Sequence, residues 1–190
     1  QRPQDDDGMR QFLLYRRRKN FNVIHHNNPN RERIRNWLPS IPVHLAPTSF
    51  HKGINMSTHE RFFFVATSED FDAMLDLLYD VDVFALDLEF NDDHSYLGMI
   101  CLIQISTYHW DIFIDPFQLF EEIQGQLKFV LESEHWTKVM HGCTNDVRNM
   151  QRDFGIYMVG VIDTQIMYQE YKSIGTGTVL KFDKLAAIFF

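Results

Sequence analysis

The alternation of hydrophobic and polar side chains predicts a buried strand over residues 81–90, and the rest of the chain is organised around it. Successive side chains of a strand point to opposite faces. One face would be apolar, formed by Phe84, Leu86, Leu88 and Phe90. The other face would carry Asp87 and Glu89, with Cα atoms roughly 6.5 Å apart because a strand rises ~3.3 Å per residue.

Hydrophobic patterns on either side of this strand predict a series of further strands and helices. We expect strands at residues 62–66, 97–107, 110–115, 138–141 and 159–162. We expect helices after Thr67, over residues 117–131, over residues 144–154, after Asp163 and over residues 180–190. Strands with short links pair antiparallel and strand–helix–strand units pair parallel, so this order predicts an α/β fold with a mixed five- or six-stranded sheet flanked by helices.

Residues 1–58 lack this periodicity and contain several prolines, an acidic run at 5–7 and a basic run at 16–19. We interpret them as an extended N-terminal arm or linker with one short helix near residues 9–19, and we place the folded domain at residues 59–190. Such an arm wraps its own domain or docks a partner. The basic run is either a contact for RNA or a solvated charged surface.

Composition narrows the classes of function. The 190 residues carry a net charge of −8, which argues against a protein that coats nucleic acid with basic surface but not against a nuclease with an acidic site. Cys101 and Cys143 have no metal-site spacing, and we expect both to be buried and reduced, which suits an intracellular protein. The sequence begins with Gln1 and stops inside an apolar run, so we expect a fragment of a longer chain.

The paired carboxylates are the first candidate for chemistry. Two like charges on one face of an apolar strand repel each other and resist burial unless a cation neutralises them. Carboxylate oxygens suit Mg²⁺ or Mn²⁺, so Asp87 and Glu89 are candidate metal ligands. The alternative is a solvated acidic pair without function.

Several motifs along the chain strengthen the first reading. They are Asp-Leu-Glu at 87–89, Ser-Tyr-Leu-Gly at 95–98, Cys-Leu-Ile-Gln-Ile-Ser-Thr at 101–107, His-Gly at 141–142 with Asp146, Gln-Arg-Asp-Phe-Gly-Ile-Tyr at 151–157, and Asp-Thr at 163–164. In order and spacing this set resembles the ribonuclease D-like 3′→5′ exoribonucleases of the DEDD superfamily over residues 60–190. The match is closest to the exonuclease associated with the eukaryotic nuclear exosome.

This resemblance implies a ribonuclease H-like exonuclease fold and hydrolysis of RNA from its 3′ end to nucleoside 5′-monophosphates, with two divalent cations, Mg²⁺ or Mn²⁺. It implies that Asp87, Glu89 and Asp146 are the catalytic metal ligands. Candidate contacts for the RNA are Tyr96, Gln104, His141 and Asn145, although a hydrogen-bonded structural role is the alternative for His141. The implied partners are a single-stranded RNA 3′ end and the proteins of an exosome-like complex, and the implied location is the nucleus.

Two departures from the family pattern stand out. The family places a fourth carboxylate and a tyrosine together as Tyr-x-x-x-Asp on a later helix, and this motif does not occur in the 190 residues. Asn149 stands where the family commonly has tryptophan. We read Asp163 as a helix cap and not as the fourth ligand. We therefore expect the 190 residues alone to be inactive or weakly active.

Two other functions remain open from the sequence. A degenerate exonuclease fold could serve as an RNA-binding or scaffold subunit of a larger RNA-processing assembly. A DNA exonuclease of the same superfamily is a weaker alternative, because the resemblance to the nuclear exoribonuclease family argues against it. It stays open because recognition of the 2′-hydroxyl group leaves no readable mark in this sequence.

Overall fold

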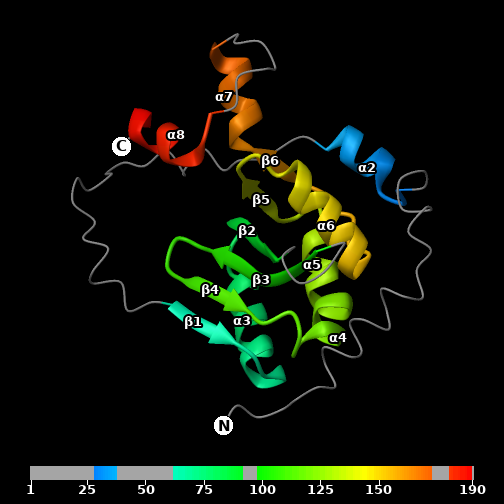
Figure 1. Ribbon diagram of the computed structural model, residues 1–190. Coiled ribbons are helices and arrows are strands. Elements are labelled where there is room, and N and C mark those ends of the chain that lie inside the picture. Colours follow the sequence, from blue (N-terminus) through cyan, green and yellow to red (C-terminus); the bar gives the residue numbers. More distant parts are fainter. Residues whose placement is uncertain (1–27, 38–61, 92–97, 173–179, 190) are drawn as a thin grey trace.

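Six strands form one mixed sheet (Figure 1) in the computed structural model, which describes residues 28–37, 62–91, 98–172 and 180–189. Their order across the sheet is β1-β4-β3-β2-β5-β6. The strands are β1 (Phe62–Val65), β2 (Val83–Asn91), β3 (Met99–Ser106), β4 (Asp111–Ile114), β5 (Thr137–Met140) and β6 (Val161–Asp163). β2 and β4 pair antiparallel with β3, whereas β1–β4, β2–β5 and β5–β6 are parallel. The expected mixed α/β sheet is confirmed, with six strands.

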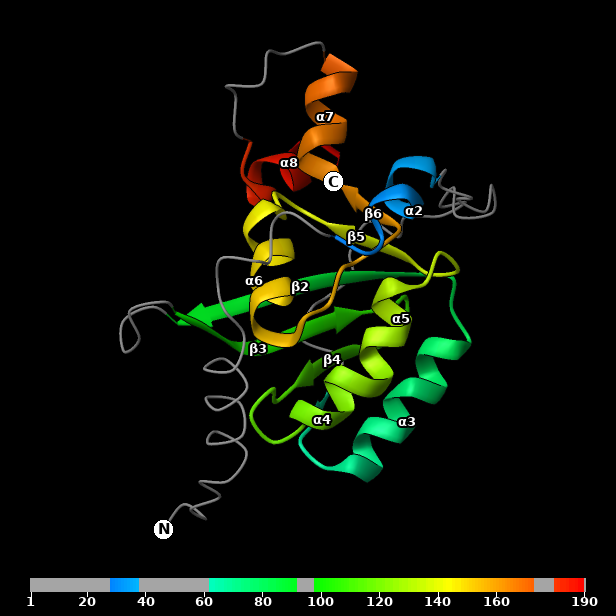
Figure 2. The ribbon, with the colours of Figure 1, turned by 90° about the vertical axis from the view of Figure 1, so that its right-hand side faces the viewer.

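One face of the sheet is apolar and covered by helices. Leu86 and Leu88 of β2 stand opposite Ile105 and Ile103 of β3, and the row continues into β4. The covering helices are α3 (Ser68–Tyr79), α4 (Phe120–Glu122), α5 (Lys128–Glu132) and α6 (Thr144–Phe154), whose buried side chains join the same core (Figure 2). The opposite face of the sheet, which carries none of these four helices, is called the open face below.

The helix expected over residues 117–131 is divided. α4 and α5 are joined by a π-helical turn, Ile123–Leu127, which contains Gly125. Ile123 and Leu127 are both fully buried, so the wider turn still presents its apolar side chains to the core. Gly125 is exposed, and an added Cβ there would meet nothing within 4 Å.

Helices α7 (Thr164–Lys172) and α8 (Phe182–Phe189) follow β6 and lie beyond the β5–β6 end of the sheet (Figure 1). Within α8, Leu185 is buried, at 8% exposure, whereas Phe189 is 63% exposed. Within the described residues, no helix has the length and apolar character needed to cross a membrane. Cys143 is buried and Cys101 only half-buried, and both are free thiols.

One short helix of the N-terminal region was not expected. α2 (Arg31–Asn36) buries no side chain of its own and is held by polar contacts with the domain. The preceding Asn30 donates from Nδ2 to the carbonyl of Tyr157 at 2.9 Å, and Arg33 donates to the carbonyl of Glu132 at 2.8 Å. This part of the arm therefore lies against its own domain. The helix expected near residues 9–19 lies outside the described residues.

Candidate metal and nucleotide site

The open face of β2 carries the paired carboxylates. Side chains along this strand alternate between buried and exposed, and Ala85, Asp87 and Glu89 are on the exposed side. Asp87 and Glu89 therefore lie on the same face of the strand, as the alternation in the sequence predicted. β2 lies between β3 and β5 in the middle of the sheet, and at Asp87 and Glu89 it is paired with β3, because its pairing with β5 ends at Ala85.

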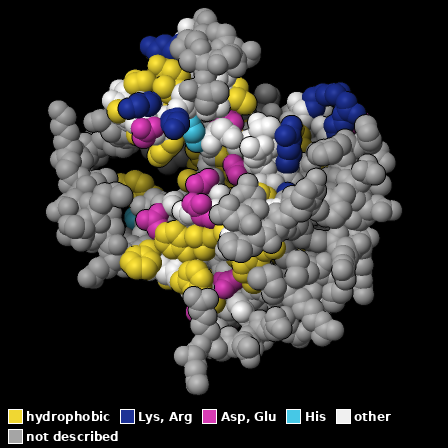
Figure 3. Space-filling model, viewed as in Figure 1, with side chains coloured by type: hydrophobic (Ala, Val, Ile, Leu, Met, Phe, Trp, Pro, Cys, Tyr) yellow, Lys and Arg dark blue, Asp and Glu magenta, His cyan; other side chains and the backbone are white. Residues whose placement is uncertain are grey.

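The neighbouring strand β3 supplies a polar partner. Gln104 stands directly opposite Asp87, and its Nε2 donates to Glu89 Oε1 at 3.1 Å. This bond orients Glu89 along the open face and leaves its other carboxylate oxygen available as an acceptor. Figure 3 shows acidic side chains gathered on this face of the molecule, below α7 and α8.

Asp146 approaches the pair from the first turn of α6. β2 and β5 run parallel, and β5 ends opposite the middle of β2, so α6, which follows β5, begins near the part of β2 that carries Asp87. Burial and the charge of Asp87 raise the pKa of Asp146 to about 6, with smaller contributions from Asp163 and Glu89. Burial is the largest cause of this rise in pKa, and the charge of Asp87 adds to it because the two side chains lie close together.

Asp163, at the end of β6, has a different role. Its Oδ1 accepts from the backbone N–H groups of Gly142 and Gln165, both at 2.9 Å, and its Oδ2 accepts from that of Cys143 at 2.9 Å. Burial acts to raise the pKa of Asp163, but these backbone donors outweigh it and lower the pKa below its usual value. The side chain caps α7, as predicted, and also fixes the loop that starts α6.

The donor set fits a hard divalent cation in its chemistry. Asp87, Glu89 and Asp146 offer only carboxylate oxygens, the ligands that Mg²⁺ and Mn²⁺ prefer. Within the described part of the chain, however, no three His, Cys, Asp or Glu side chains stand close enough together to hold an ion. The carboxylates share one region but are not closed around a single point.

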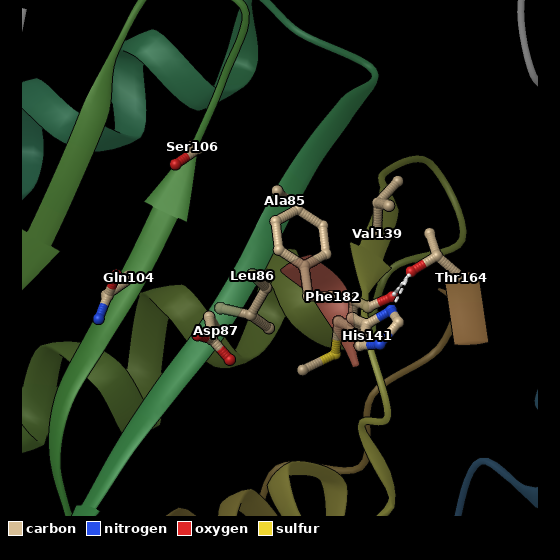
Figure 4. Close-up of a pocket in the computed structure, with 10 residues that line it drawn as sticks. Ala85, Leu86, Asp87, Gln104, Ser106, Val139, His141, Thr164 and Phe182 are labelled. Atoms are coloured by element: carbon tan, nitrogen blue, oxygen red, sulfur yellow. Dashed lines mark hydrogen bonds between the residues drawn. The ribbon is translucent and has the colours of Figure 1, made fainter. Parts of the chain in front are cut away.

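A pocket of about 340 Å³ opens beside Asp87 (Figure 4). Its lining combines polar and apolar side chains, namely Ala85, Leu86, Asp87, Gln104, Ser106, Val139, Met140, His141, Thr164 and Phe182. They come from β2, β3, the end of β5 with the residue that follows it, α7 and α8. A concave site with an apolar wall and a few polar groups is the usual form of a small-ligand site.

The sequence-based RNA candidates fall in different places. Gln104 and His141 line the pocket, while Asn145 is exposed on α6 and is not part of its lining. Tyr96 lies outside the described residues. His141 places Nδ1 2.9 Å from Thr164 Oγ1 and Nε2 2.7 Å from the carbonyl oxygen of Leu180, so both ring nitrogens have partners within the chain.

Three lining residues were not singled out from the sequence. Ser106 shares the exposed side of β3 with Gln104, a position that strand alternation could have revealed. Thr164 belongs to the Asp-Thr motif at 163–164 but was not assigned a contact, and Phe182 reaches the pocket only through the fold of α8, so that no local pattern marks it.

Comparison with known proteins places this geometry in a family. Residues 62–189 match the model of a 3′-5′ exonuclease domain, which is more than half of the chain. The chain belongs to this exonuclease family. The match covers all six strands of the sheet and therefore includes the open face with Asp87 and Glu89.

Similar proteins within the family are linked to the exosome. The chain is 39% identical over 108 residues to the exosome complex component 10 homolog of Caenorhabditis elegans, a match that covers 57% of this chain and 12% of the relative. It is 40% identical over 111 residues to the exosome complex exonuclease RRP6 of Saccharomyces cerevisiae, with 58% and 15% covered. The chain thus spans less than one sixth of the length of these two relatives.

A solved structure agrees with the exonuclease fold. The catalytic core of RRP6 from Trypanosoma brucei superposes with a TM-score of 0.64 at 34% identity, covering 76% of this chain and 39% of that one. The expected ribonuclease H-like exonuclease architecture is therefore confirmed for the domain.

Proposed function

We propose that this chain provides the metal-binding half of a 3′→5′ exoribonuclease site that shortens RNA and releases nucleoside 5′-monophosphates. The observation that carries the proposal is the placement of three carboxylates. Asp87 and Glu89 share the open face of β2, and Asp146 stands in the first turn of α6, close enough for the charge of Asp87 to act on it. Family membership supports the reaction type.

Each carboxylate has a role that follows from its position. Asp87 lies on the pocket wall and binds metal there, Glu89 is oriented by Gln104, and Asp146 contributes from α6. Two Mg²⁺ or Mn²⁺ ions, when bound, activate a water molecule and stabilise the leaving 3′-oxygen of the scissile phosphodiester. Asp163 keeps the first turn of α6 in place through its bonds to Gly142 and Cys143.

We further propose that the protein acts in a nuclear, exosome-like complex on single-stranded RNA 3′ ends. The support is the similarity of the chain to an exosome component and to an exosome exonuclease. We also propose the division into an N-terminal arm, residues 1–58, and an exonuclease domain, residues 59–190. Part of that arm, residues 28–37, contacts the domain.

The 190 residues alone should bind divalent metal weakly and shorten RNA slowly or not at all, since they contain no Tyr-x-x-x-Asp motif. The loss of a supporting group at a metal site typically costs ~10–100-fold, and the loss of a direct ligand should cost more. The test uses 5′-labelled RNA with Mg²⁺ or Mn²⁺ and then with EDTA. It compares the 190-residue chain with a chimera that continues, after α8, with the corresponding segment of the Trypanosoma brucei RRP6 catalytic core.

Asp87→Asn should abolish the metal-dependent shortening by the chimera while leaving its melting temperature in EDTA unchanged or slightly raised, because one of two like charges is removed. Asp111→Asn is the matched control, since Asp111 lies on the same open face two strands away and bonds to Ser106 Oγ at 2.6 Å. A chimera without metal-dependent shortening, or an Asp87→Asn variant that melts far below its parent, would contradict the assignment.

A second function is favoured by one observation. Within the described residues the carboxylates do not form a closed metal cluster, which is what a degenerate exonuclease used as an RNA-binding or scaffold subunit would show. RNA binding that is unaffected by EDTA, together with an inactive chimera, would establish that alternative.

A further inference from the structure

An exposed aromatic ring stands at the pocket mouth. Phe182, the first residue of α8, is 64% exposed although it lies beside the buried Leu185 of the same helix. Figure 4 shows its ring in front of β2, between Ala85 and His141, on the side of the strand that carries Asp87. Phe182 also borders the apolar groove between α7 and α8, whose lining includes the exposed Phe189, but Phe182 alone of these two also lines the pocket beside Asp87.

The backbone before Phe182 is held by hydrogen bonds to the side chains of His141 and Gln165. The carbonyl oxygen of Leu180 lies 2.7 Å from His141 Nε2 and accepts from Gln165 Nε2 at 3.1 Å. A carbonyl oxygen can only accept, so Nε2 of His141 carries a hydrogen. His141 also packs edge-on against the Phe182 ring, with centroids 5.5 Å apart. One histidine thus holds both the backbone and the ring at the mouth.

The pocket matches a single nucleotide in size and character. Its volume of about 340 Å³ is at the small end of the ~300–1,000 Å³ range of ligand sites. A nucleobase has flat apolar faces and polar edges, and proteins bind unpaired bases by stacking them on aromatic rings while polar side chains meet the edges. Here Phe182 offers the ring, and Gln104, Ser106 and Thr164 offer polar groups.

We propose that Phe182 is the stacking surface for the 3′-terminal base of the RNA and that His141 is a positioning residue that holds Phe182 in place through Leu180. The proposal rests on the proposed function and adds the specificity-determining contact. It also assigns to His141 an indirect role, because both of its ring nitrogens are already engaged within the chain.

The test measures binding of the 190-residue chain, in Mg²⁺, to two 5′-labelled RNAs that differ only in whether the terminal nucleotide carries its base or is abasic. Removing a base–aromatic stack weakens binding by about 5- to 150-fold. Phe182→Ala should weaken binding to the intact RNA by this factor and leave binding to the abasic RNA unchanged. Phe182→Trp should preserve the difference between the two RNAs.

The controls separate stacking from a general effect on α8. Phe189→Ala removes an equally exposed ring, 63%, from the same helix but away from the pocket, and should leave both affinities unchanged. His141→Ala should reduce the difference between the RNAs, and His141→Gln, whose amide can still donate to Leu180, should restore part of it.

A difference between the RNAs that survives in Phe182→Ala would overturn this inference and leave the proposed function standing. Failure of the unmodified chain to bind either RNA would overturn both. Melting temperatures of all variants show whether any change arises from loss of the fold.

Discussion

At the scale of single residues, Asp146 reports most directly on the site. Its pKa is raised to about 6 in the folded chain, so between its usual value and about 6 the folded state holds more protons than the unfolded state. The contribution to the free energy of unfolding is therefore full at low pH and is lost as the pH rises through about 6. Metal-free protein at neutral pH retains an ionised, partly buried Asp146 at a cost.

This cost predicts that Asp146→Asn stabilises the metal-free protein. At pH 8 in EDTA, the free energy of unfolding should increase by up to about 2 kcal/mol, since one pKa unit corresponds to ~1.4 kcal/mol. The lost attraction between a carboxylate and the helix N-terminus, about 0.5 kcal/mol, is smaller. Urea unfolding at several pH values measures the effect, which should shrink toward zero near pH 4. A variant that is less stable at pH 8 would show that the carboxylate is structurally required.

The side chains of the candidate site were predicted from the sequence only in part. A period of two places Asp87 and Glu89 on one face regardless of the rest of the fold, and a carboxylate between a strand and a helix is a familiar cap, which is how Asp163 behaves. The contact between His141 and Leu180 joins residues 39 positions apart, and no local pattern encodes it. Phe182 was missed for the same reason.

At the scale of elements, one glycine holds a position that no other residue fits. Gly160 has φ +70°, and an added Cβ would lie 2.8 Å from the carbonyl oxygen of Trp136 and 3.3 Å from the Trp37 ring. It therefore allows the segment before β6 to pass between β5 and the docked end of the arm. Both the positive φ and the backbone contact exclude a side chain.

Gly160→Ala should lower the free energy of unfolding by about 2–4 kcal/mol, through backbone strain and a contact that only backbone movement can relieve. Gly125→Ala is the matched control, because Gly125 lies in the π-helical turn with open space around it, and it should be neutral or stabilise by up to about 1 kcal/mol. Chemical denaturation of both variants provides the measurement. Equal stability of the two would contradict the role given to Gly160.

The elements show where sequence patterns suffice. Strands and helices with apolar side chains at regular spacing were found, because each must bury one side in the shared core. The π-helical turn within the helix expected over residues 117–131 was not predicted, since an extra residue in a turn leaves the apolar spacing nearly unchanged. α2 was missed because it has no apolar face and depends on polar contacts with distant loops.

At the scale of the whole molecule, the N-terminal segment depends on the folded six-stranded sheet and its helices for its contacts. The arm returns across more than a hundred residues to reach Tyr157, so its docking requires the domain to be folded first. Arg33, whose bonds to the carbonyl of Glu132 and to Glu134 are exposed, should contribute little energy to this docking. The domain, in contrast, is held by one continuous core.

The central place of β2 has a consequence for hydrogen exchange. β1 and β6 form the edges of the sheet and can open locally, whereas β2 separates from its neighbours only when β3 and β5 are both released. The amides of β2 from Ala85 to Asn91, which pair with the central strand β3, should therefore exchange with deuterium more slowly than those of the edge strand β1, as mass spectrometry of peptic fragments would show. Equal rates would refute this. The backbone spacing of the two carboxylates would thus persist when an edge of the sheet opens.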